Sequence, residues 1–427
     1  MSSRSWLFLV TGLLAAVLVT LIGFLTPWQI LSVPIHQISA ANDFTTAELN
    51  RAKTFHSSLI PWGVGSWAVS LIAVGLLGFT SFGFRLLSLI PGPALLRTFL
   101  GVLAIESVIN IVQLPFDVER EKVLRIYGLS TQRWVSWLVE RVQHFAIGAC
   151  LTGLGLVAFA FCARTFGQRW WLVGGAGAAL LVVIVSFGYP LVFEPIFNKF
   201  TPMAPSVLRD DLMAMAAHDG VPVKQILIAD ASKRTTALNA YVSGFGATRR
   251  IVLYDVLLST ASPTEVKLVV AHELGHAKVN DVGRYTLVGA LSSALGVGFI
   301  GLFLGWAPLL KRAGFEPSSN PITDPRGVAA ILALIAFFTL AQQPISTLIS
   351  RHIEARADVH ALNLTRDANG FVEMQRTLAI SNLSDPNPNT ILFWLFGTHP
   401  TAPERIGIAR AWAKVNGQIA PLPLANR

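Results

Sequence analysis

Two histidines and a glutamate stand close together in the segment AHELGHAKVND, residues 271–281. If this segment is helical, His272 and His276 lie one turn apart on the same face, where both can offer a ring nitrogen to one metal ion. Glu273 projects about 100° away, beside the coordination position that a catalytic zinc leaves open. The spacing therefore predicts a zinc site that activates water, with Glu273 as the general base.

The residues before this segment carry the signals of a helix start. Ser262 is an N-cap residue, Pro263 suits the first helical position, and Glu265 stands three residues after Ser262, as in a capping box. An apolar run continues from there towards the histidines. We therefore predict a helix over residues 262–280.

A catalytic zinc needs three protein ligands, and the two histidines supply two of them. Both cysteines of the chain lie in one apolar segment, so the third ligand must be a histidine or a carboxylate. The best candidate is Glu354, which shares a helix face with Asp358 at the i, i+4 spacing. We predict that Glu354 binds zinc and that Asp358 orients a ligand histidine from behind.

The segment around Glu354 has a second interpretation. Glu354 and Asp358 could instead pair with Arg351 and Arg356 on a solvated helix. Only the need for a third ligand favours the metal-binding interpretation. Two further histidines are offset from the Glu354 face, and we interpret them as ordinary polar residues: His352 and His360.

The composition is that of a membrane protein. Of the 427 residues, 53% are apolar and only 13% are charged, about half the charged fraction of soluble proteins. The net charge of +9 comes from Lys and Arg that sit between apolar segments, where they orient the chain in a bilayer. We therefore expect the lipid bilayer, and no nucleic acid, as a partner.

Seven apolar stretches are long enough to cross a bilayer. The first resembles a signal peptide, but its length indicates a retained span. The expected spans are residues 6–29, 60–82, 94–113, 145–162, 170–192, 285–310 and 327–349. The fold class is thus a mainly α, polytopic membrane protein.

Two polar regions interrupt the apolar stretches, and we expect four parts in the chain. These are a five-span membrane region (1–198), the part with the HELGH segment (199–283), a membrane hairpin (284–350) and a C-terminal part (351–427). Two spans separate the polar parts, so both lie on one side and can share a site. We also expect helices at 206–218 and 403–415, strands at 225–228 and 250–254, and an interfacial helix at 117–141.

The charges give an orientation and the polar residues inside one span suggest a cavity. Lys and Arg near span ends are more frequent on the side of the HELGH segment, which places this side in the cytoplasm. Glu106, Asn110 and Gln113 form one polar face of the third span, and such a face usually looks onto water or another helix. We expect an enclosed chamber with the zinc at one end.

The order of several motifs resembles that of the integral-membrane zinc metalloproteases of the type I CAAX prenyl protease family. The resemblance covers about residues 190–410, and seven spans match as well. The motifs are FNKFTP (197–202), SKR (232–234), NAYVSGF (239–245), RIVLYD (250–255), HELGH (272–276), Glu354 with Asp358, and His399-Pro400 followed by Glu404-Arg405.

The resemblance implies a role for each matching residue. It implies that His272, His276 and Glu354 hold one Zn²⁺ and that Glu273 is the catalytic base. It also implies that three residues line the site near the substrate, and either of the last two could stabilise the oxyanion: Asn239, His399 and Arg405.

The substrate is expected to be a peptide in an extended conformation. The stretches 239–245 and 249–255 indicate two strands, and an edge strand can hold a peptide through Asn239, Ala240 and Tyr241. The peptide could come from a prenylated protein or, in a bacterium, from a misfolded membrane protein. Short connections and a short tail favour a bacterial cell membrane over the endoplasmic reticulum. The alternative is a transporter or chaperone-like protein with a structural zinc, which four protein ligands would close.

Overall fold

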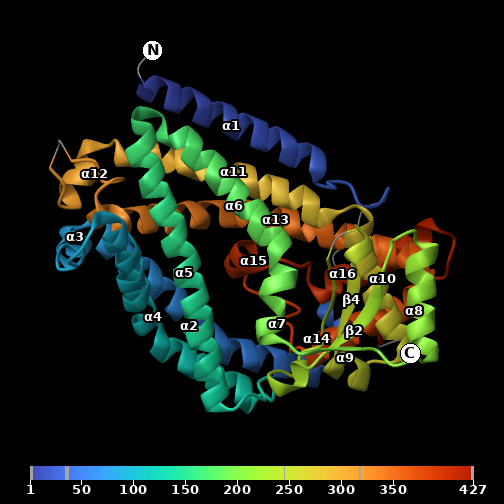
Figure 1. Cartoon of the computed structure of the whole chain (residues 1–427). Helices are drawn as coiled ribbons and strands as arrows, with labels where there is room; N and C mark the ends of the chain where they lie inside the picture. Colours follow the sequence, from blue (N-terminus) through green and yellow to red (C-terminus); the bar gives the residue numbers. More distant parts are fainter. Residues whose placement is uncertain (1–2, 34–37, 245, 317–318, 425–427) are drawn as a thin grey trace.

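The computed structural model describes residues 3–33, 38–244, 246–316 and 319–424, and within them the chain is mainly helical (Figure 1). Long apolar helices make up one part of the molecule. Shorter helices and a small sheet make up the other. The helices are α1 (Ser3–Leu25), α2 (Thr46–Phe79), α3 (Ser81–Ser88), α4 (Ala94–Ile126), α5 (Trp134–Phe166), α6 (Trp170–Val192), α7 (Glu194–Phe197), α8 (Val207–His218), α9 (Asp255–Thr260), α10 (Pro263–Lys278), α11 (Asp281–Leu304), α12 (Ala307–Arg312), α13 (Val328–Thr365), α14 (Ala368–Ser381), α15 (Thr390–Phe396) and α16 (Ala402–Val415).

The described residues contain six helical segments long and apolar enough to cross a membrane, where the sequence predicts seven spans. The fourth segment, Trp134–Phe197, has 64 residues, which is about three times the length that a bilayer requires. It contains α5 and α6, which pack against each other. The short basic link between them is a 3-10 turn, η2 (Gly167–Arg169), and Gly167 has a positive φ of 51°. The chain therefore turns at this link, and α5 and α6 are two helices that lie side by side.

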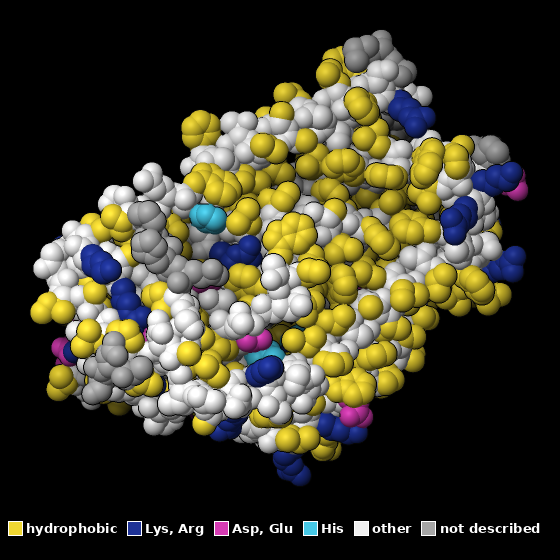
Figure 2. Space-filling model, turned by 180° about the vertical axis from the view of Figure 1, so that it is seen from behind, with side chains coloured by type: hydrophobic (Ala, Val, Ile, Leu, Met, Phe, Trp, Pro, Cys, Tyr) yellow, Lys and Arg dark blue, Asp and Glu magenta, His cyan; other side chains and the backbone are white. Residues whose placement is uncertain are grey.

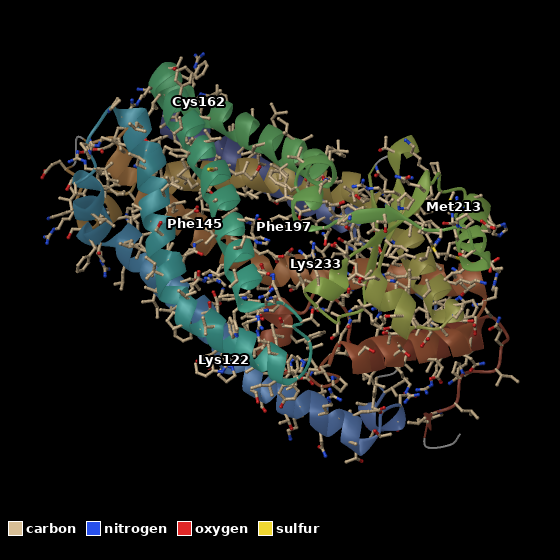
Figure 3. All side chains as sticks on the ribbon, turned by 60° about the horizontal axis from the view of Figure 1, so that its bottom comes forward. Lys122, Phe145, Cys162, Phe197, Met213 and Lys233 are labelled. Carbon is tan, nitrogen blue, oxygen red and sulfur yellow. The ribbon has the colours of Figure 1, made fainter. Side chains whose placement is uncertain are left out.

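The expected interfacial helix at 117–141 is wrong as a separate element. Its first part is the end of α4, which has 33 residues and continues to Ile126 despite Pro115. Its second part is the beginning of α5 at Trp134. The charged and aromatic residues therefore extend two membrane helices beyond their apolar parts. Figure 3 shows the resulting length, with Cys162 near one end of α5, Phe145 further along it and Lys122 towards the other end of this helix pair.

The polar face of α4 lies against other helices and beside a small cavity. The Asn110 side chain donates to the carbonyl of Glu106 at 3.0 Å, and the Gln113 side chain donates to the Ser66 carbonyl on α2 at 3.5 Å. Asn110 and Arg141 also line a cavity of about 230 Å³ between α4 and α5. The larger chamber expected from the sequence stays a prediction.

The sheet has four strands in the order β1-β2-β4-β3. The strands β2 and β4 are parallel, and both were expected from the sequence. The antiparallel pairing of β3 with β4 confirms the hairpin-like pair, and it leaves β3 at an edge. The strand expected at 239–245 corresponds to β3, which ends at Ser243. Phe245, the last residue of that expected strand, lies outside the described residues. The strands are β1 (Phe200–Pro202), β2 (Gln225–Ala229), β3 (Ala240–Ser243) and β4 (Arg250–Tyr254).

The helix α10 lies at the centre of the polar part. Nine of its sixteen residues are buried, which means that it is covered on nearly all sides. It packs against α13, α14, α8 and β3. Trp412 of α16 and Phe371 of α14 are almost fully buried in the same core. A helix held on so many sides is a rigid support for the side chains of a site.

The helix α13 connects the two parts of the molecule. It has 38 residues and passes Pro344 without a break, so the seventh predicted span and the segment around Glu354 form one helix. The expected boundary at residue 350 therefore falls inside α13. Figure 1 shows α13 running from the end of the molecule near α12 to the end that carries α10 and the sheet.

Candidate metal centre

The first half of the site is on α10, whose start is fixed by a complete capping box. The Ser262 side chain accepts from the Glu265 backbone N–H at 3.3 Å, and the Glu265 carboxylate accepts from the Ser262 N–H at 2.7 Å. This pair confirms the helix start predicted from the sequence. It also fixes the register in which His272 and His276 share one face.

The second half of the site is on α13, which approaches α10 closely at Gly275. A Cβ atom at this position would lie 3.0 Å from the Cβ of His360, tighter than an ordinary contact. Glycine therefore allows a helix spacing that a side chain would prevent. This spacing brings Glu354 opposite the two histidines, although 82 positions separate it from His272.

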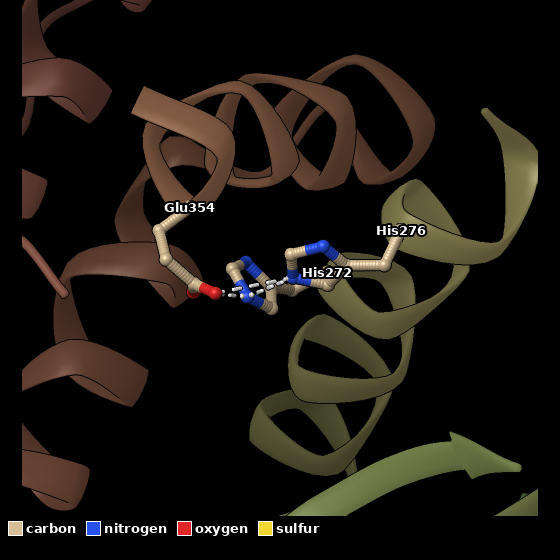
Figure 4. A group of neighbouring side chains, drawn as sticks. All are labelled: His272, His276 and Glu354. Carbon is tan, nitrogen blue, oxygen red and sulfur yellow. Dashed lines mark hydrogen bonds and ion pairs between the residues drawn. The ribbon is translucent and has the colours of Figure 1, made fainter. Parts of the chain in front are cut away.

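Three potential ligand atoms converge between the two helices (Figure 4). Glu354 Oε2 lies 3.1 Å from His272 Nε2, and Glu354 Oε1 lies 3.6 Å from His276 Nε2. The two Nε2 atoms are 3.2 Å apart. Zinc–nitrogen bonds of about 2.0–2.1 Å in a tetrahedral arrangement place donor atoms about 3.3 Å apart. The spacing of the three side chains fits a zinc ion.

Each histidine is oriented from behind by a carboxylate. His272 Nδ1 lies 2.9 Å from Asp358 Oδ1, and His276 Nδ1 lies 2.9 Å from Asp281 Oδ2. A neutral imidazole that donates from Nδ1 turns an unprotonated Nε2 towards the centre. The two Nε2 atoms and the Glu354 carboxylate that faces them are then all hydrogen-bond acceptors. Acceptors held so close together need a cation between them, which is the second reason that a metal fits.

Asp281 was missing from the residues singled out in the sequence. It is the first residue of α11, it is buried, and Arg356 also donates to it. Asn280 before it adopts a left-handed conformation with φ of 56°, a geometry that Asn tolerates better than most residues. The turn at Asn280 directs Asp281 back towards His276. The available signal was an acidic residue five positions after the second histidine.

The partners of the basic residues on α13 argue against a solvated helix. Arg356 pairs with Asp281, and Arg351 donates to the carbonyl of Gly397 at 2.7 Å. Glu354 and Asp358 contact His272 instead of these two arginines. The Asp358 side chain is completely buried, and a carboxylate is seldom buried in this way unless it is paired.

The charges around His272 have opposing effects on its pKa. Burial lowers the pKa of His272, but the hydrogen bonds to Asp358 and Glu354 outweigh burial and raise the pKa to about 10 in the metal-free chain. The pKa of Glu273 is raised chiefly because its carboxyl group is buried, while the two histidines oppose the shift. A carboxylate with a raised pKa accepts a proton more readily, as a general base requires.

The two candidate oxyanion stabilisers lie in different places. His399 is exposed at the edge of the site, with Nε2 3.2 Å from Glu354 Oε2. Arg405 lies behind His272, where its guanidinium donates to both oxygens of Asp358 at 2.8 and 2.5 Å. Arg405 is thereby held away from the open side of the centre. The geometry supports a positioning role for Arg405 and leaves His399 as the residue that can reach a substrate.

The three predicted substrate-binding residues lie on or beside the edge strand β3. Ala240 is buried in the core that contains α10, and the Tyr241 ring packs on the other face of the sheet beside Tyr254. Asn239 is exposed, and its carbonyl accepts from the Tyr254 N–H. Their side chains are thus spread over different surroundings. Within the described sheet, β3 pairs only with β4, so its other backbone edge is available to a peptide.

The membrane helices and the centre formed by the HELGH helix and a distant glutamate define a membrane-embedded metallopeptidase. The family model "Peptidase family M48" matches residues 206–413. A second model, "CAAX prenyl protease N-terminal, five membrane helices", matches residues 46–199. The two models together cover most of the chain, which belongs to the integral-membrane metallopeptidases of the CAAX prenyl protease family.

Individual relatives agree with this assignment. The CAAX prenyl protease 1 of Saccharomyces cerevisiae is 28% identical over 328 residues, which cover 72% of this chain and 70% of that protein. The uncharacterized metalloprotease YhfN of Bacillus subtilis is 28% identical over 311 residues, covering 73% and 72%. The crystal structure of S. mikatae Ste24p matches with a TM-score of 0.77 at 20% identity, covering 95% of this chain and 99% of that one. This structural match shows a common fold.

Proposed function

We propose that this metallopeptidase is a zinc endopeptidase in which His272, His276 and Glu354 bind the metal and Glu273 is the general base. The observation that supports it most is the set of three mutually facing acceptors, with each histidine oriented by a carboxylate. The same set has three protein ligands among the described residues. A structural zinc is normally closed by four ligands, so the alternative of a binding protein is not favoured.

The side chains around the metal then divide the chemistry among them. A zinc ion held by His272, His276 and Glu354 would supply an acidified water and a Lewis acid for the scissile carbonyl. Glu273 takes a proton at its carboxylate and returns it to the leaving amine. His399, at the open edge beside Glu354, donates a hydrogen bond to the developing oxyanion. Asp358 and Asp281 keep the two histidines in the required tautomer.

The edge of β3 supports the binding of an extended peptide. Asn239 accepts from Tyr254, and Tyr241 and Ser243 face Val252 and Arg250 in the antiparallel register. Because hydrogen-bonded pairs alternate in such a ladder, the backbone groups of Ala240 and Val242 point away from β4. A substrate strand can add to this edge next to α10. In this arrangement the binding comes from the backbone rather than from the side chains of Asn239, Ala240 and Tyr241.

The substrate class that we propose is a peptide segment near a lipidated or membrane-anchored end. The site is built on α13, which continues directly into the membrane region, so a substrate held in the bilayer can reach it. The two polar parts, 199–283 and 351–427, then face the cytoplasm, as the distribution of Lys and Arg indicates. The likeness to the CAAX prenyl protease 1 of yeast supports a prenylated substrate. A bacterial cell membrane fits the short connections of the chain.

A matched set of substrates tests this proposal. The purified protein is incubated with a farnesylated CAAX peptide, with the same peptide lacking the farnesyl group, and with casein. We expect cleavage of the farnesylated peptide, measured by mass spectrometry of the products, and its loss after chelation of the metal. Preferential cleavage of casein would indicate that the substrates are unfolded membrane proteins rather than prenylated ones. If none of the three is cleaved, the proposed substrate class is wrong.

The role of Asp281 gives a separate prediction. In Asp281→Asn the amide can no longer act as the charged partner of His276 Nδ1, and we expect zinc affinity to fall by about 10- to 100-fold. Zinc affinity is measured by competition with a chelator, and the thermal unfolding temperature is measured on the same samples. Added zinc should restore most of the activity.

The control for this variant is Asp211→Asn, which breaks an exposed ion pair with Lys267. It should keep wild-type zinc affinity. If Asp281→Asn lowers the unfolding temperature while zinc affinity stays at the wild-type value, Asp281 serves only the α11–α13 contact with Arg356.

A further inference from the structure

A deep apolar pocket opens between α2, α11, α12 and α13, far from the metal centre. Its volume is about 660 Å³, within the range of sites that bind small molecules. On α13 it ends at Ala341, thirteen residues before Glu354, which corresponds to about 20 Å along the helix. Half of its twelve lining residues carry aromatic rings: Phe79, Phe299, Phe303, Trp306, Phe337 and Phe338. The pocket is therefore separate from the peptidase site.

The pocket lies where membrane helices meet the surface of the bilayer. Phe299 and Phe303 belong to the last turns of α11, and Trp306 follows directly after that helix. Trp306 is half exposed, as is common for tryptophans at the level of lipid headgroups. Water has few polar partners in such a lining, whereas a hydrocarbon chain from the adjacent leaflet fills it at no desolvation cost. The lining therefore fits an acyl chain.

The same pocket carries a positive charge at its edge. Arg312, the last residue of α12, lines the pocket, and Lys311 precedes it. Arg4 of α1 lies beside Gly305 at the same end. Within the described ranges none of these three cations forms an ion pair with an acidic side chain, including Glu316 nearby in the sequence. Figure 2 shows hydrophobic side chains over the right-hand part of the molecule seen from behind, with several Lys and Arg side chains and an acidic one at the right-hand edge.

We propose that this pocket binds one anionic phospholipid, with an acyl chain among the aromatic rings and the phosphate group at Arg312. An apolar pocket with an unpaired guanidinium at its rim matches a lipid at both of its ends. A guanidinium stays charged at physiological pH, and its planar set of N–H donors matches the oxygens of a phosphate group. The lipid would tie α12 to α2, α11 and α13 in the leaflet opposite the metal centre.

Native mass spectrometry of the full-length protein in detergent tests this site. The protein is titrated with phosphatidylglycerol and with phosphatidylcholine of the same acyl chains. We expect one tightly held phosphatidylglycerol, favoured over phosphatidylcholine by about fivefold, the factor that one cation near a lipid surface contributes. Arg312→Gln should reduce this preference to near parity, and Ala341→Trp should remove the bound lipid by filling the pocket.

Two control variants distinguish specific lipid binding in the pocket from non-specific effects of losing a cation or enlarging a side chain. Arg85→Gln removes another exposed cation that does not line the pocket, and Ala16→Trp enlarges an exposed residue on α1. Both should retain the bound phosphatidylglycerol. The proposal is overturned if the wild type holds both lipids equally or holds neither. It is also overturned if the Arg85 and Ala16 variants lose as much lipid as the Arg312 and Ala341 variants.

Discussion

Glu273→Gln is expected to abolish peptidase activity while the protein keeps its metal. Glutamine has nearly the same shape as glutamate, so α10 and the positions of His272 and His276 should not change. It cannot accept a proton from water, and loss of a general base lowers the rate by about 10²- to 10⁴-fold. The raised pKa of Glu273, caused by burial, fits its use as a base. The measurement is kcat on the farnesylated peptide together with zinc content per chain.

The control for Glu273→Gln is Glu119→Gln, which alters a partly exposed glutamate paired with Lys122. It should keep wild-type kcat and zinc content. A Glu273→Gln protein with full activity would remove Glu273 from the mechanism. If this variant loses its zinc, its low activity would say nothing about proton transfer, and the metal-loaded variant would have to be measured by adding zinc.

Glu354→Ala is expected to have the second large effect, through loss of the metal itself. Removing this carboxylate leaves two of the three proposed ligands, His272 and His276 on α10. Loss of an outer partner costs about 10- to 100-fold in metal affinity, so loss of a direct ligand should cost more than about 100-fold. Activity should fall with zinc content. Added zinc should restore little of it.

The matched control lies on the same helix two residues earlier. His352 Nδ1 lies 3.0 Å from the Leu348 carbonyl oxygen, and the His352 ring makes an edge-to-face contact with Trp28. His352→Ala should therefore keep wild-type zinc affinity. If His352→Ala lost zinc and Glu354→Ala did not, the third ligand would have to be reassigned to the histidine. Equal loss in both would indicate damage to α13 rather than loss of a ligand.

The local features of the site could be predicted from the sequence because they depend on neighbouring residues. The capping box at Ser262 and the helical spacing of His272 and His276 need no information from elsewhere in the chain. The membrane character, the strands β2 and β4, and the helix α16 follow from composition and periodicity in the same way. The ends of the membrane helices were less well predicted. The helix α4 continues past its apolar part to Ile126, and α5 begins at Trp134, where charged residues suggested a separate element.

Composition and local spacing are sufficient to predict a membrane protein with a helix able to present two histidines to a metal. Glu354 and Asp358 were candidates in the sequence, but whether they lie beside these histidines depends on the packing of the helices, as does the position of Asp281. Glu354, Asp358 and Asp281 reach the histidines because Gly275 lets α13 lie close to α10 and because the turn at Asn280 directs α11 back. The structure likewise placed Arg405 behind His272 rather than in the open cleft. Helical periodicity is a short-range property, whereas the approach of two helices depends on side chains that are far apart in the chain.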